Sequence, residues 1–142
     1  EVPEELKEKI QSLFWAGCCG DDETKQTIGR VWQEHHYLCD THTAVAWNVA
    51  LQYKSANPAH APVVVLSTAS PYKFPAAVLE GLGEKAEGDE FAVMEQLERL
   101  TGIPAPKNLR GLRERPVRHT TVLDREEMLP FVLEKAQEKK WF

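Results

Sequence analysis

One short apolar run that ends abruptly in hydroxyl residues constrains this chain more than any other feature. The run is Val63-Val64-Val65-Leu66, and it continues directly into Ser67-Thr68-Ala69-Ser70-Pro71-Tyr72-Lys73-Phe74-Pro75. Four apolar residues bounded by turn residues are typical of a short, fully buried strand in a parallel sheet covered by helices. We therefore expect a strand over residues 63–66 and a polar turn at its carboxyl end, where ligands bind in open α/β sheets.

The same turn has an ordinary structural interpretation. Ser and Thr are common helix-capping residues, and a helical apolar pattern follows the turn in Phe74, Val78, Leu79 and Leu82, ending at Gly83. A polar turn also carries no reaction by itself. The spacing alone leaves open whether residues 67–70 form a binding site or only join a strand to a helix.

The neighbouring segments alternate between short apolar stretches and helical patterns. Residues 37–39 predict a second strand, Asp40 or Thr41 can cap the helix that follows, and a later helix pattern over residues 91–100 ends at Gly102. We therefore predict an α/β fold, a partial three-layer α/β/α domain with a small, mainly parallel sheet flanked by helices. Residues 1–142 are expected to form a single domain with three parts: a helical entry region (1–36), a strand-helix-strand-helix core (37–83) and C-terminal helices and loops (84–142).

Composition excludes several classes of partner. The chain has 22 acidic and 17 basic residues and a net charge of -5. It therefore lacks the excess of positive charge that binding to nucleic acid or to an anionic membrane requires. No apolar run approaches the roughly 18 residues of a membrane span, and no secretory leader is evident, so we expect a cytoplasmic protein. Cys18, Cys19 and Cys39 show no C-x-x-C spacing, so neither a metal site nor a disulfide framework is predicted.

Five blocks spread over most of the chain form an ordered set. They are Phe14-Trp15-Ala16-Gly17, Asp21-Asp22-Glu23-Thr24, Asp40-Thr41-His42-Thr43-Ala44-Val45-Ala46, Leu66-Ser67-Thr68-Ala69-Ser70-Pro71-Tyr72-Lys73-Phe74 and Pro116-Val117-Arg118-His119-Thr120-Thr121. This set resembles the C-terminal segment of threonine synthase, a pyridoxal-phosphate enzyme, in the family's order and with similar gaps. The family commonly has proline where this chain has Thr41, a departure that leaves His42 and Thr43 in place.

The resemblance implies the second structural class of pyridoxal-phosphate enzymes, in which a Ser or Thr hydroxyl faces the pyridine nitrogen. It assigns that role to Thr68, with Ser67 as a further cofactor-binding candidate. A hydroxyl does not hold the nitrogen protonated as a carboxylate would, so the ring is a gentler electron sink. His42, Lys73 and Arg118 are candidates for the substrate side, since Lys and Arg bind phosphate groups. His42 near a helix start is expected to be neutral, and a hydrogen bond from it to a nearby loop carbonyl is an equally good interpretation.

Parts of the family's chemistry are missing from this sequence. The flanks of Lys73 match the family's C-terminal signature, whereas the Schiff-base lysine and the Gly- and Asn-rich phosphate loop lie upstream in the family. The eight glycines are scattered, so no backbone nest for a phosphate can be recognised. We therefore expect no catalytic residue, no metal and no bound cofactor in this chain, which alone should be inactive.

The resemblance implies a function for the complete enzyme. Threonine synthase is a carbon-oxygen lyase that converts O-phosphohomoserine and water to threonine and phosphate in threonine biosynthesis. The start at Glu1 without methionine fits an excised segment, so the expected partners are the remainder of a threonine synthase chain and the small-molecule substrate, with self-association through an exposed apolar face. Two alternatives stay open: a stand-alone interaction domain without catalysis, and part of a related pyridoxal-phosphate lyase acting on another amino acid.

Overall fold

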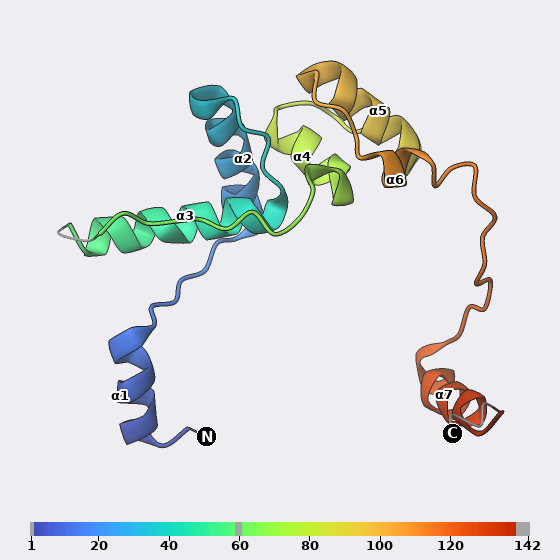
Figure 1. Ribbon diagram of the computed structural model, residues 1–142, viewed down its shortest axis with the longest axis horizontal. Coiled ribbons are helices and arrows are strands. Elements are labelled where there is room, and N and C mark those ends of the chain that lie inside the picture. Colours follow the sequence, from blue (N-terminus) through green and yellow to red (C-terminus); the bar gives the residue numbers. More distant parts are fainter. Residues whose placement is uncertain (1, 59–60, 139–142) are drawn as a thin grey trace.

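The computed structural model describes residues 2–58 and 61–138, and its regular elements are helices (Figure 1). They are α1 (Glu4–Leu13), α2 (Asp21–His35), α3 (Thr41–Ala56), the 3₁₀ turn η1 (Pro71–Lys73), α4 (Pro75–Gly81), α5 (Glu90–Thr101), α6 (Lys107–Arg110), the 3₁₀ turn η2 (Arg125–Glu127) and α7 (Met128–Glu138). None of the described residues lies in a strand. The fold is all-α over this part of the chain, and the predicted α/β fold with a small, mainly parallel sheet is wrong.

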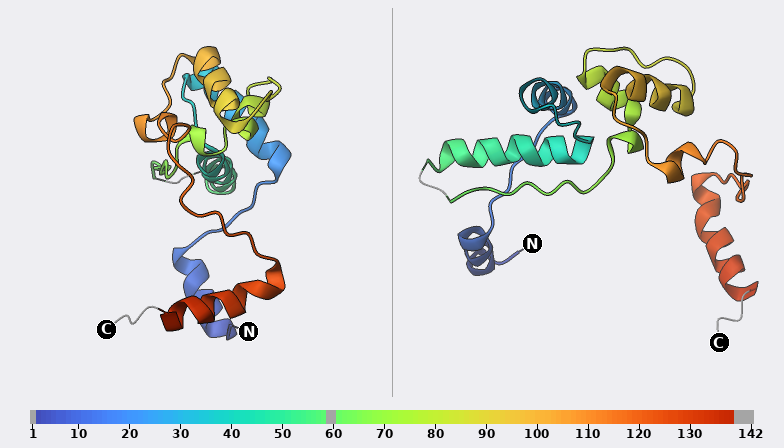
Figure 2. Two further views of the ribbon diagram at one scale, coloured as in Figure 1. Left: turned by 90° about the vertical axis from the view of Figure 1, so that its right-hand side faces the viewer. Right: turned by 45° about the horizontal axis from the view of Figure 1, so that its top comes forward.

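Both segments predicted as strands are connections between helices. Residues 36–40 join α2 to α3, with Leu38 and Cys39 buried, and residues 61–68 run in an extended course beside α3 (Figures 1 and 2). A strand becomes part of a sheet only when its backbone N–H and C=O groups pair with a neighbouring strand. Within the described residues, no backbone-to-backbone hydrogen bond involves residues 62–68. The valine-rich segment therefore has an extended backbone, but it has no partner strand among the described residues and forms no sheet.

The core forms where α4 packs between α2 and α5. Helix α3 packs against α2. Ile28 of α2, Leu79 of α4 and Leu97 of α5 are all fully buried. The helix pattern predicted over residues 91–100 is confirmed as α5, in which Met94 and Leu97 are buried but Leu100 is 45% exposed. The helix ends at Gly102 in the left-handed conformation, as its glycine indicates. This core holds the connection from residue 67 to residue 74 against the beginning of α3.

Two glycines set the distance between α2 and α4. A Cβ atom on Gly29 would lie 2.4 Å from the carbonyl oxygen of Gly81, and a Cβ atom on Gly81 would lie 2.9 Å from the carbonyl oxygen of Lys25. Only residues without a side chain allow the two backbones to approach so closely. The position of α4, which directly follows the polar turn, therefore depends on this crossing.

The two terminal helices lie away from the core (Figures 1 and 2). Residues 14–20 lead from α1 to α2, and an extended segment over residues 116–124 leads to η2 and α7. Neither α1 nor α7 has a buried residue among those described, and apolar side chains such as Leu13 and Leu129 are exposed. In the described ranges, no helix combines the length and the apolar character needed to cross a membrane.

Candidate functional site

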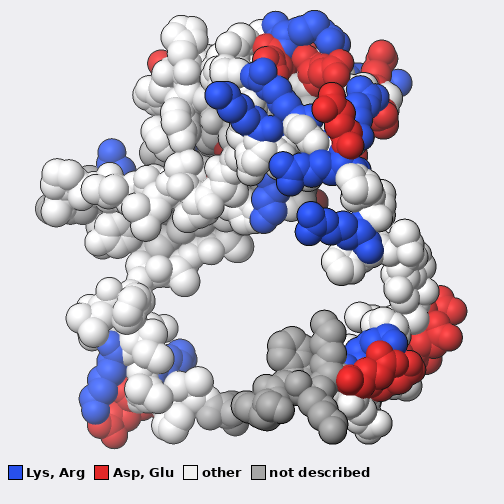
Figure 3. All heavy atoms as spheres, turned by 45° about the vertical axis from the view of Figure 1, so that its right-hand side comes forward, with Lys and Arg blue, Asp and Glu red and all other residues white. Residues whose placement is uncertain are grey.

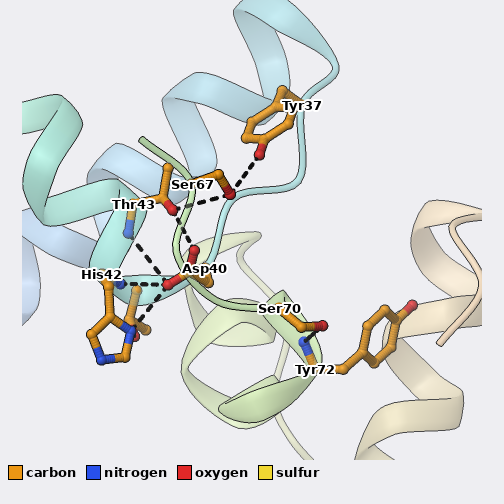
Figure 4. Close-up of polar contacts among 8 residues, drawn as sticks. Tyr37, Asp40, His42, Thr43, Ser67, Ser70 and Tyr72 are labelled. Carbon is orange, nitrogen blue, oxygen red and sulfur yellow. Dashed lines mark hydrogen bonds and ion pairs between the residues drawn. The ribbon is translucent and has the colours of Figure 1, made fainter. Parts of the chain in front are cut away.

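The first turn of α3 is organised by the carboxylate of Asp40. This buried N-cap residue accepts hydrogen bonds from the backbone N–H of His42 at 2.8 Å and of Thr43 at 3.3 Å. The Thr43 hydroxyl donates to its second oxygen, and Nδ1 of His42 lies 3.0 Å from its first (Figure 4). Burial alone raises the pKa of Asp40, but the hydrogen bonds from Thr43 and His42 outweigh this and hold the pKa below its ordinary value.

Ser67 ties the polar turn to the beginning of α3. The Tyr37 hydroxyl donates to Ser67 Oγ at 2.9 Å, and the hydroxyl oxygens of Thr43 and Ser67 lie 3.4 Å apart. With Asp40, these side chains form a continuous polar chain across three segments (Figure 4). Because Ser67 is engaged in this way, its main role in the structure is to hold the start of the turn.

The other end of the turn is fixed through Tyr72. Ser70 Oγ caps η1 by accepting the backbone N–H of Tyr72 at 3.2 Å. The buried Tyr72 ring reaches toward α5, and its hydroxyl donates to the carbonyl of Ile103. Burial raises the pKa of the Tyr72 hydroxyl, so it stays protonated as this hydrogen bond requires. Residues 68 and 69 are therefore held between two anchored residues.

Thr68 lies at this fixed point with its side chain exposed. It lines a hollow of about 330 Å³ together with Ala69, Ser70, Lys73, Pro106, Asn108 and Leu109. No hydrogen bond from the Thr68 hydroxyl to any other described residue is present, so this hydroxyl is available to a ligand. Among the residues predicted from the sequence, Thr68, Ser70 and Lys73 are thus brought together around one hollow.

The three substrate-side candidates do not meet at one place. Lys73 lines the same hollow as Thr68, with Nζ 5.4 Å from the centroid of the Phe74 ring. His42 packs against that same ring, with centroids 5.8 Å apart, but it lines a second hollow of about 610 Å³ between α2, α3 and α4. Arg118 is exposed in the extended segment before η2 and lines neither hollow.

Sequence reasoning missed the second role of Asp40. We predicted Asp40 or Thr41 only as a helix cap. The structure identifies Asp40 as the cap and also places its carboxylate beside the His42 ring. The signal was present, because the N-cap residue and the residue two positions later lie side by side at a helix start. Tyr37, whose partner Ser67 is 30 residues away, offered no comparable signal.

Charge is distributed unevenly over the surface. On the face drawn in Figure 3, Lys, Arg, Asp and Glu side chains gather over α5, α6 and the terminal regions, and the rest of this face carries few of them. Between residues 41 and 72, Lys54 is the single charged residue apart from any charge on His42 and His60. Val64 and Leu66 in this stretch are 81% and 72% exposed. The described residues contain no group of three or more side chains suited to a metal ion.

Comparison with known proteins matches the larger part of the chain to one family. Residues 43–132 match the family model described as threonine synthase, C-terminal. The chain belongs to the threonine synthase family. Ser67, Thr68, Lys73 and Arg118 lie inside the matched range, whereas Asp40 and His42 lie just before it. The resemblance drawn from the sequence is therefore confirmed.

Individual members of the threonine synthase family give the same result. The chain is 37% identical over 78 residues to threonine synthase-like 2 of Homo sapiens, covering 55% of this chain and 16% of that protein. It is 39% identical over 82 residues to threonine synthase-like 1 of Mus musculus (56% and 10%) and 38% identical over 74 residues to threonine synthase of Methylobacillus glycogenes (52% and 15%). The match thus spans only a small part of the length of these relatives.

Proposed function

We propose that this chain is the C-terminal part of a threonine synthase whose complete form converts O-phosphohomoserine and water to threonine and phosphate with pyridoxal phosphate. The family match over residues 43–132 supports this proposal. The observation that carries it is the Thr68 hydroxyl, which is exposed beside a hollow on a turn anchored at Ser67 and Tyr72. A fixed hydroxyl with no partner among the described residues is suited to hold one polar atom of a ligand.

The described residues fit one end of pyridoxal phosphate. Thr68 would hold the pyridine nitrogen, and Ser67 would keep the turn in position through Tyr37. When bound, the cofactor supplies an electron sink for chemistry at the substrate carbons. The left-handed glycines Gly83, Gly88 and Gly102 stand singly near helix ends, so among the described residues they form no phosphate-binding loop. We propose that the phosphate loop and the Schiff-base lysine belong to the remainder of the enzyme, and that this chain alone is inactive.

We propose Lys73 as the first substrate-side candidate. It lines the same hollow as Thr68, and an ammonium group can bind a phosphate. His42 lines another hollow. Arg118 lies in an exposed segment and lines neither of the two hollows. We therefore rank Lys73 above both for contact with the substrate phosphate.

The test is a pair of substitutions at Thr68 in the complete protein. Thr68→Val keeps the shape but removes the hydroxyl, and we expect phosphate release from O-phosphohomoserine to fall roughly 10- to 100-fold, as for loss of one well-placed hydrogen bond. Thr68→Ser retains the hydroxyl and should stay within a few-fold of the parent. Full activity of the Val variant would refute the role of Thr68, and turnover of serine or threonine in place of O-phosphohomoserine would refute the proposed substrate.

We further propose that the remainder of the longer protein covers the exposed apolar surface of residues 62–66. The supporting observations are the exposure of Val64 and Leu66, the unpaired backbone of residues 62–68, and the much greater length of the relatives. An uncovered surface of this kind favours association. The isolated chain should therefore self-associate, and Val64→Lys with Leu66→Lys should yield monomers by analytical ultracentrifugation. A monomeric parent chain at high concentration would contradict this proposal.

A further inference from the structure

The pair formed by Asp40 and His42 lies outside the function proposed above. The Asp40 side chain is 2% exposed and the His42 side chain is 50% exposed, with Oδ1 and Nδ1 3.0 Å apart. Figure 4 shows the His42 ring directed away from Ser67 and Tyr37, with its second nitrogen at the end of the ring farther from Asp40. A buried carboxylate therefore holds one nitrogen of a ring whose other nitrogen is open.

The state of the carboxylate determines where the ring proton lies. Asp40 has a pKa below its ordinary value, so near neutral pH it is ionised, and an ionised carboxylate only accepts hydrogen bonds. The contact with Nδ1 is a hydrogen bond only when Nδ1 carries the hydrogen. The Thr41 hydroxyl, at 3.4 Å from the same nitrogen, makes a longer contact. Neutral His42 is therefore the Nδ1–H tautomer, with a free lone pair on Nε2.

The lone pair on Nε2 is one of the uncharged acceptors beside the hollow that His42 lines, together with the hydroxyl oxygens of Thr24 and Thr41. The charged side chains that face it are Asp21, Lys25 and Glu80, from α2 and α4. Lys25 Nζ lies 2.7 Å from Glu80 Oε2, and the mutual pairing of these two groups offsets their charges. The thiol of Cys19 is engaged with the Thr24 hydroxyl at 3.4 Å. The side chains of Phe74 and Val45 form part of the apolar wall of this hollow.

We infer that Asp40 is a positioning residue that keeps the ring proton of His42 on Nδ1, so that Nε2 accepts a proton from water or from a hydroxyl-bearing small molecule in this hollow. In that step the O–H bond breaks, its electron pair stays on oxygen, and an N–H bond forms at Nε2. The ionised Asp40 carboxylate continues to accept the Nδ1 hydrogen during this step. The inference rests on the geometry of this chain and does not depend on the reaction proposed above.

Nitrogen NMR of the histidine-labelled chain tests the position of the proton. In two-bond proton–nitrogen spectra, the neutral ring of His42 should show a protonated Nδ1 and an unprotonated Nε2. Asp40→Ser keeps a helix-capping hydroxyl but not the carboxylate. It should move the tautomer ratio roughly tenfold or more toward Nε2–H, as expected for loss of a charge-assisted hydrogen bond.

A control variant separates the contact with His42 from the other contacts of Asp40. Thr43→Val removes the hydrogen bond to the other oxygen of Asp40 and should leave the Nδ1–H tautomer unchanged. An Nε2–H tautomer in the parent chain, or the same tautomer ratio in Asp40→Ser and the parent, would overturn the inference. Neither outcome bears on threonine synthase activity, because no readout uses the cofactor.

Discussion

Substitution of Gly29 by alanine tests whether the crossing of α2 and α4 holds the core together. In an unconstrained helix this change stabilises by about 1 kcal/mol, because alanine is the better helix former. Here the added Cβ would lie 2.4 Å from the Gly81 carbonyl oxygen, well inside van der Waals contact, and the obstacle is backbone that no side-chain rotation can move. Overpacking of this kind costs about 1–3 kcal/mol, and backbone-against-backbone contact belongs at the upper end. We therefore expect a net loss of about 1–2 kcal/mol.

The assay is urea unfolding followed by circular dichroism at the helix band, with thermal unfolding as a second measure. A loss of this size should lower the melting temperature by roughly 3–8 °C for a chain of this length. Gly111→Ala is the matched control, because its added Cβ would lie 3.6 Å from the nearest atom, the Lys107 carbonyl oxygen, at ordinary contact distance. A Gly29→Ala variant more stable than the parent would refute the reasoning, since helix propensity would then act unopposed.

Other substitutions test single contacts. Asp40→Ala should cost about 1–2 kcal/mol in urea unfolding because the α3 cap is lost. The pKa of Asp40 is lower in the folded chain than its ordinary value, so Asp40 contributes to the free energy of unfolding above the unfolded pKa of about 4, and this contribution disappears as pH falls through the lower folded value. Urea unfolding midpoints measured from pH 7 to pH 3 should therefore decline in the parent and decline less in Asp40→Ala. Tyr72→Phe should cost about 1 kcal/mol by leaving the Ile103 carbonyl without its donor. Burial raises the pKa of Cys39 to about 11, so a thiol reagent at pH 8 should modify the exposed Cys18 quickly and Cys39 only on unfolding.

Features encoded by neighbouring residues were predictable from the sequence. Asp40 caps α3 as expected, and the apolar spacing of Met94 and Leu97 identified the buried side of α5 before its glycine stop at Gly102. These outcomes depend on hydrogen bonds and side-chain positions within one or two helical turns. Such local rules act in the same way whatever else the chain contains.

Features that depend on a distant partner were not predictable. Residues 63–66 have strand-forming side chains, but β-propensity measures how well a residue fits a paired, half-buried surface rather than a preference of the backbone. Without a partner strand among the described residues, the same side chains gave an extended connection. The contact between Tyr37 and Ser67, which are 30 residues apart, likewise follows from the packing of α3. No sequence pattern around either residue predicts it.

The extended segment before α7 places Arg118 on a short tether. Residues 111–115 after α6 form turns, and Arg113 pairs with Asp89 and Glu95, so the extended chain before Arg118 begins at residue 116. Because a fully extended chain advances roughly 3.3–3.6 Å per residue, this part lets the Arg118 backbone lie about 10 Å from residue 115. Because α7 has no buried residue among those described, we expect the course of this tether to depend on any surface that α7 meets in the complete protein. The protection of Arg118 from arginine-specific reagents should then differ between this chain and the complete protein.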